Sequence, residues 1–105
     1  MISEEPLDFL KNRKEGAKKS ADMAKEKGGD SILSYYHFAA KNKPYSKVMS
    51  IFKNEGLDAV LKLCKAEYKN LMKTVDLNMD QKKYQAVVGE IEVYGECFIR
   101  LSKER

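Results

Sequence analysis

Two stretches of regularly spaced apolar residues in the C-terminal half constrain the fold of this chain more than any other feature. Apolar side chains recur at alternating intervals of four and three over residues 57–75 and over residues 80–103. This spacing places them on one face of an α-helix, as in a coiled-coil seam. The loop between them is short and polar, so the two helices are expected to pack as antiparallel neighbours. The two seams are Leu57, Leu61, Cys64, Tyr68, Leu71 and Val75, and Tyr84, Val87, Ile91, Tyr94, Phe98 and Leu101.

The second of these helices carries more apolar residues than one neighbour can cover. Val88, Gly95 and Ile99 widen its apolar arc to about 160°, which predicts a central helix packed on several sides. Glycine inside a helix is unfavourable by about 1 kcal/mol relative to alanine. A close helix crossing at Gly95 would explain its presence. Val93 falls nearly opposite the seam and is expected to be exposed.

Turn-forming residues divide the rest of the chain into three further helices. Ser3 is the expected N-cap of the first helix, and Gly28 is expected to end it. The residue before a proline avoids the helical region, so the second helix should end before Pro44. Gly56 is expected to separate the third helix from the fourth. The predicted ranges are 4–27, 30–42 and 46–54.

No strand pattern competes with these helices, so the predicted fold is all-α. We expect one domain over residues 1–105, a small bundle of four to five helices centred on the C-terminal antiparallel hairpin. A chain of this length can bury one modest core. No apolar run approaches the roughly 18 residues that span a bilayer. The N-terminal residues lack the basic start and apolar stretch of a signal peptide, which predicts a cytoplasmic protein.

Few residues suited to catalysis or metal binding are present. His37 is the only histidine, and Cys64 and Cys97 are far apart in the sequence, which predicts free thiols. This set cannot supply a tetrahedral zinc site, and it matches no nucleophile motif. Glu92 and Glu96 lie four apart and fit a solvated helix face better than a metal site. The prediction is therefore no enzyme, no catalytic residue, no metal and no cofactor.

The net charge of +4 is too small to identify a nucleic-acid-binding protein. Only three of the 20 basic residues are arginine. Arginine reads guanine edges and holds phosphates bidentately, whereas lysine acts as a point charge. The composition therefore argues against base-specific recognition of DNA or RNA.

Residues 31–54 form the most informative segment, because they contain no acid and interleave lysines with aromatic residues. Lysines and exposed rings together suit single-stranded nucleic acid. The same composition suits a protein partner, with rings as anchors and lysines at the rim. It is also compatible with an ordinary core beneath a solvated surface. The candidate partner-binding residues are Tyr35, Phe38, Lys41, Lys43, Tyr45 and Lys47.

The function expected from these observations is a small cytosolic, non-enzymatic interaction or regulatory module that binds a macromolecule, most readily a protein. The alternative is a lysine-rich protein that binds nucleic acid without sequence specificity through residues 31–54. Phe38, Leu63 and Val93 lie off the predicted contact faces of their helices. Apolar residues left outside a core can form an interaction patch, so we also predict a homodimer.

Overall fold

The structure, a computed structural model, describes residues 5–76 and 78–104. Across these residues it is all-α, as the apolar spacing predicts. The C-terminal antiparallel hairpin is also confirmed, because its two helices pack closely together. In chain order the elements are α1 (Pro6–Lys27), a 3-10 turn η1 (Gly29–Ser31), α2 (Ile32–Ala39), α3 (Asn42–Glu55), α4 (Leu57–Thr74) and α5 (Gln81–Ser102).

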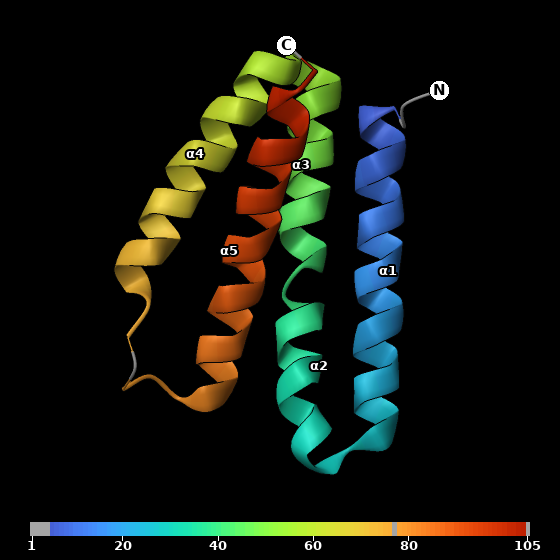
Figure 1. Cartoon of the computed structure of the whole chain (residues 1–105), viewed down its shortest axis with the longest axis vertical. Coiled ribbons are helices and arrows are strands. Elements are labelled where there is room, and N and C mark those ends of the chain that lie inside the picture. The colour runs from blue at the N-terminus through green and yellow to red at the C-terminus, as the bar shows by residue number, and fades with distance from the viewer. Residues whose placement is uncertain (1–4, 77, 105) are drawn as a thin grey trace.

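The helices are arranged as four rods, because α2 and α3 follow one another as a single bent rod (Figure 1). In Figure 1, α5 lies between α4 and the α2–α3 rod, and α1 packs on the far side of that rod. The two helices of the hairpin diverge toward their connecting loop. The last helix therefore packs against α4 and α2 as expected, whereas the first helix, also expected to pack on it, packs on the α2–α3 rod.

The helix ends agree with the turn-forming residues in most places. Gly28 ends α1 with a φ of 63°, and its N–H donates to the carbonyl of Ala24. Gly56, with a φ of 90°, separates α3 from α4 as expected. The Asp80 side chain caps α5 by accepting from the backbone N–H of Lys82. The predicted cap Ser3 lies outside the described residues.

The bend at Pro44 differs from the prediction. Helix α2 ends at Ala39, three residues before the expected end, and α3 already begins at Asn42. Pro44 therefore lies in the first turn of α3, where it is fully buried. Proline is tolerated there because the first backbone N–H groups of a helix have no intrahelical acceptor.

The buried face of α5 was predicted only in part, since Tyr94 and Leu101 of the predicted seam are buried but Phe98 is not. Val93, Cys97 and Leu101 are fully buried, whereas Phe98 is 37% exposed and Ile99 is 65% exposed. The three buried residues lie four apart, one above another on the same face of the helix. That face shares Leu101 with the predicted seam but also includes Val93 and Cys97, because α5 packs against α2 and α3 as well as α4. The contact with α4 alone does not set its orientation.

Large buried side chains concentrate where α1, α3, α4 and α5 meet. Phe9, which the sequence pattern did not single out, is buried with the Arg100 guanidinium 5.2 Å from its ring centre. Elsewhere the contact between α1 and α2 is close because the buried residues of α1 are small. The core includes Leu10, Val48, Val60, Leu61, Tyr94 and Leu101, and the small residues of α1 are Ala17, Ala21 and Ala24.

The closest helix crossing is at Gly89, not at Gly95 as predicted. A Cβ atom added to Gly89 would lie 2.2 Å from the carbonyl oxygen of His37, which belongs to the backbone of α2. At Gly95 the nearest neighbour is instead the ring edge of Tyr68, at 3.2 Å. Gly89 therefore permits the approach of α2 to α5, whereas Gly95 makes room for one side chain.

Both thiols are free and fully buried, in agreement with the sequence-based prediction. Burial raises the pKa of the Cys64 thiol to about 12. Burial also raises the pKa of Cys97, and the neighbouring Cys64 adds to that effect. Both groups are therefore protonated at neutral pH, a state that opposes nucleophilic chemistry.

The residues from which a dimer was predicted do not form a surface patch. Val93 is fully buried, Leu63 packs against the core, and Phe38 is half-buried. These three residues therefore do not support the predicted homodimer. The large apolar residues exposed in the described part of the chain are Met23, Tyr68, Met72, Phe98 and Ile99. All of them except Met23 belong to α4 and α5.

Candidate partner-binding site

The six residues predicted to bind a partner do not form one surface. Tyr45 is only 2% exposed and belongs to the core. Lys41 is largely covered and pairs with Glu92 across the boundary between α2 and α5. Lys43 and Lys47 are exposed, and the Lys47 ammonium lies 3.8 Å from a carboxylate oxygen of Glu67.

The other two predicted aromatics are half-buried and lie beside lysines. The ring of Tyr35 meets the edge of Tyr36, and the Lys25 ammonium lies 5.8 Å from the Tyr35 ring centre. Lys82 lies similarly over Tyr36, at 5.4 Å. The ring of Phe38 has the Lys41 ammonium 5.6 Å from its centre. Lysines from α1 and α5 thus join the aromatic residues of α2.

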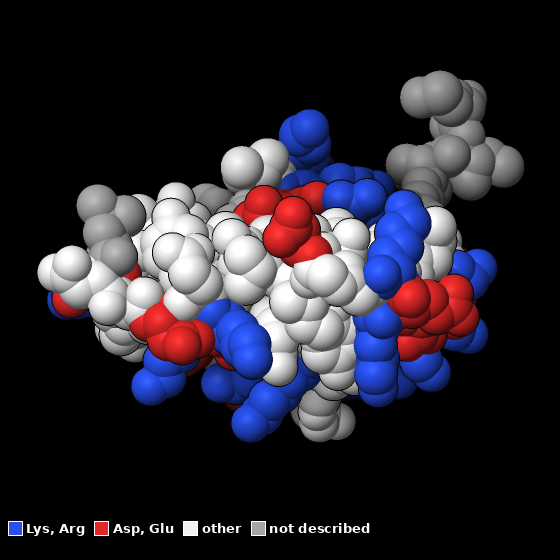
Figure 2. Space-filling model, turned by 90° about the horizontal axis from the view of Figure 1, so that it is seen from below, with Lys and Arg blue, Asp and Glu red and all other residues white. Residues whose placement is uncertain are grey.

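Figure 2 shows the end of the molecule where α1 ends and where α2 and α5 begin. Uncharged side chains occupy much of the middle of this end, with lysines or arginines and some acids around them. Sequence spacing along residues 31–54 could not indicate this cluster, because Lys25 and Lys82 belong to other parts of the chain.

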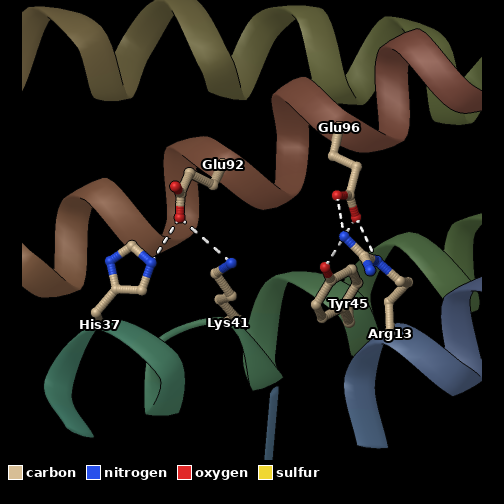
Figure 3. A network of polar contacts seen from close by, with 6 residues as sticks. All are labelled: Arg13, His37, Lys41, Tyr45, Glu92 and Glu96. Carbon is tan, nitrogen blue, oxygen red and sulfur yellow. Dashed lines mark hydrogen bonds and ion pairs between the residues drawn. The ribbon is translucent and has the colours of Figure 1, made fainter. Parts of the chain in front are cut away.

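Glu92 and Glu96 of α5 stay partly exposed, as expected of a solvated face, but they also join α5 to the other rods (Figure 3). One Glu92 carboxylate oxygen lies 2.6 Å from the His37 Nε2 and 3.3 Å from the Lys41 Nζ. Glu96 accepts two hydrogen bonds from the Arg13 guanidinium, one of them 2.9 Å long from Nε. The Tyr45 hydroxyl donates to Glu96 at 3.2 Å. The two carboxylates therefore fix α1, α2 and α3 against one side of α5.

Replacing Glu96 with glutamine should lower stability at neutral pH but have little effect in acid. Burial alone would raise the pKa of Glu96, but the hydrogen bond and charge of Arg13, with the Tyr45 hydroxyl, outweigh it and lower the pKa. A lowered folded-state pKa stabilises the protein at pH 6–7, and this contribution is lost between about pH 5 and pH 3. Because Arg13 is half exposed, the expected loss at pH 7 is about 1 kcal/mol.

Urea unfolding at pH 7 and at pH 3 measures this difference. Glu104→Gln is the matched control, because Glu104 also pairs with an arginine, but that residue, Arg100, is only four positions away and the pair joins no two helices. We expect the control to change stability by less than about 0.5 kcal/mol. An equal effect of Glu96→Gln at both pH values would show that its charge contributes nothing.

A polar hollow of about 260 Å³ lies beside this network, between α1 and the α2–α3 rod. Arg13 and Lys41 both line it, and two cations beside one hollow could bind an anion. Each of these cations already has a carboxylate partner, in Glu96 and Glu92 respectively. The hollow is therefore better explained as the open edge of the network than as a binding site.

An apolar groove lies on the hairpin, between α4 and α5. Its volume is about 380 Å³, and almost all of the surface exposed within it is apolar. Tyr68 and Phe98 are both partly exposed, and Ile99 is the most exposed large apolar residue of the described chain. We call this feature the α4–α5 groove. It is lined by Cys64, Lys65, Tyr68, Lys69, Gly95, Phe98 and Ile99.

The groove results from the orientation of α5 and from Gly95. Because the buried face of α5 is centred on Val93, Cys97 and Leu101, its apolar arc extends past the core on the side of α4. Gly95 has no side chain, and the Tyr68 ring lies next to its backbone. The wide apolar arc of α5 was the sequence feature that could have indicated an exposed apolar surface, although not its position.

The described residues show few alternatives to this site. Among residues 5–76 and 78–104, no three histidine, cysteine or acidic side chains gather where they could hold a metal ion. Within the same residues, no helix is both long enough and apolar enough to cross a membrane.

A scan against protein-family models finds no match, and searches of curated proteins and of solved structures also find none. The fold defines the class, a small all-α helical bundle.

Proposed function

We propose that this protein is a small, non-enzymatic interaction module that binds a protein partner through the α4–α5 groove. The observation that carries the proposal is the gathering of Tyr68, Phe98 and Ile99 around one apolar hollow. Exposed apolar residues are ordinary when scattered, but a continuous patch marks an interaction surface. Partly exposed aromatic residues in a concave site are also the usual anchors of protein–protein interfaces.

Three further observations are consistent with a binding role. The only histidine, His37, is paired with Glu92, and neither buried thiol is poised as a nucleophile. The free thiols are compatible with the expected cytoplasmic location. Self-association stays a prediction, and its basis moves from Phe38 and Val93 to the exposed residues of α4 and α5.

Nucleic-acid binding is the second candidate function, and the cluster of Tyr35 and Tyr36 with Lys25 and Lys82 is the observation that favours it. Rings beside lysines can stack bases while the lysines contact phosphates. The candidate is weaker because the burial of Tyr45 removes one predicted stacking residue. Lys41 also has a carboxylate partner within the protein. Binding to DNA or RNA that weakens steeply with salt would favour this candidate.

The test compares the proteins that wild type and two variants retain from a lysate. Ile99→Glu introduces a charge into the groove, whereas Met23→Glu introduces one at a similarly exposed apolar residue of α1. We expect Ile99→Glu to lose at least about tenfold of the specific capture and Met23→Glu to keep it. Equal capture by all three proteins, or capture abolished by nuclease treatment, would contradict the proposed function.

A further inference from the structure

We infer that the partner of the α4–α5 groove is an amphipathic helix that carries acidic side chains beside its apolar face. This inference rests on the proposed function and specifies the chemistry of the partner. The groove is apolar, lysines line one of its walls, and two α5 carboxylates near it already pair with cations of other elements. Each of these three features constrains a different property of the partner.

The apolar lining requires apolar side chains on the partner. Tyr68 of α4 lines the groove next to Gly95 of α5, and Phe98 and Ile99 of α5 line it as well. A helix that docks in such a groove presents apolar residues three and four positions apart. Burial of these side chains against Tyr68, Phe98 and Ile99 would supply most of the affinity.

The lysines of α4 give the groove a positive wall. Lys65 and Lys69 line the groove. Lys62 lies three residues before Lys65, and Lys73 lies four residues after Lys69. Residues at these intervals share one side of a helix. Beyond its first turn α4 carries a single acid, Glu67, and that carboxylate pairs with Lys47 of α3. Asp58 lies four residues before Lys62, but Lys65, Lys69 and Lys73 have no acid of α4 three or four residues away.

Two of the three acids of α5 pair with cations outside α4 and not with this wall. Glu92 and Glu96 are directed toward α1, α2 and α3, where they pair with Lys41 and Arg13 (Figure 3). A partner with acidic residues along one flank would complement the lysine wall, and a basic partner would be repelled. Lys73 lies eleven positions after Lys62, about 16 Å along the helix axis. This length suits a partner helix of about three turns.

The experiment uses two designed helical peptides with the same leucines at intervals of three and four. One peptide carries glutamates beside the leucines, and the other carries lysines at the same positions. Fluorescence anisotropy measures their binding to the full chain at low salt. We expect the glutamate peptide to bind at least about tenfold more tightly, and this preference should fall as salt is added.

Charge reversal in the protein makes the test specific. Lys65→Glu/Lys69→Glu should reverse the preference, so that the lysine peptide binds better. Lys11→Glu/Lys18→Glu makes the same charge change at two exposed positions of α1 and should preserve the preference. Ile99→Glu should abolish binding of both peptides. Circular dichroism confirms that all variants keep their helical content, since the substituted side chains are exposed.

Several outcomes would overturn the inference without affecting the proposed function. Equal binding of both peptides would show that the lysine wall does not select the partner. Failure of both peptides, with lysate capture still sensitive to Ile99→Glu, would mean that the partner has another shape. A dimer that Ile99→Glu dissociates and neither peptide displaces would show that a second copy fills the groove. Lysate capture insensitive to Ile99→Glu would instead remove the proposed function itself.

Discussion

Gly89→Ala should destabilise the protein by about 2 kcal/mol, although alanine is the better helix former. The added Cβ would lie 2.2 Å from the His37 carbonyl oxygen, so α2 and α5 must move apart. Overpacking of this kind is unfavourable by about 1–3 kcal/mol, and by more when backbone must shift. The better helix propensity of alanine offsets about 1 kcal/mol of that. Thermal unfolding should show a Tm lowered by roughly 10 °C.

Gly16→Ala is the matched control for this prediction. Gly16 also lies inside a helix, but nothing outside its own helix is within 4 Å of an added Cβ. Its replacement should stabilise the protein by about 0.5–1 kcal/mol, because only the helix propensity changes. If Gly89→Ala were also stabilising, α2 and α5 would not cross at this residue, and the arrangement of the rods would need revision.

Leu101→Ala should be the more damaging of two substitutions near the end of α5. Leu101 is fully buried in the core, so its truncation should lower the free energy of unfolding by about 2–5 kcal/mol. Ile99→Ala removes a side chain that is mostly in water, and the change should be within about 0.5 kcal/mol. Urea unfolding of both variants measures the difference directly.

A third variant, Phe98→Ala, tests the orientation of α5, on which the α4–α5 groove depends, because Leu101 is a core residue both in the predicted seam and in the structure. In the seam that the sequence spacing predicts, Phe98 is a core residue and Val93 is exposed. In the structure these two assignments are exchanged. If Phe98→Ala proved as damaging as Leu101→Ala, the predicted seam would hold and the groove would be filled by the protein's own core.

The two sides of α5 have different roles. On one side, Glu92 and Glu96 hold charged and polar groups of α1, α2 and α3, which fixes the helix in place. On the other side, α5 meets α4 and leaves Ile99 and part of Phe98 uncovered. The polar network therefore supports the orientation that exposes the apolar residues. Weakening it with Glu96→Gln should affect stability before it affects the groove.

The candidate site could be predicted only in part. The sequence indicated a basic and aromatic segment at residues 31–54, but burial of Tyr45 and the ion pair of Lys41 separate its members. The lysines of α4 are visible in the sequence as well, at intervals of three and four. Their role as one wall of a binding groove depends on Phe98 and Ile99 of a different helix. Only the packing of α4 against α5 brings the lysines and these apolar residues together.

Local properties of the sequence determined the helices and most of their ends, the boundary between α2 and α3 being the exception. Apolar spacing defined the two C-terminal helices, and Gly28 and Gly56 ended helices where a positive φ was needed. These features depend on neighbours within about four residues, so they can be recognised without a structure. The hairpin could be predicted from the short polar loop, because two helices joined by a short loop pack as antiparallel neighbours.

Only the tertiary structure decided which side of α5 is buried and where the helices approach most closely. A helix with apolar residues over about 160° can be buried on several overlapping faces. The choice among them depends on contacts between residues far apart in the chain, such as Gly89 with His37 and Glu96 with Arg13. The spacing within α5 does not encode those contacts. Burial of Val93 and exposure of Ile99 were therefore settled by the neighbouring rods.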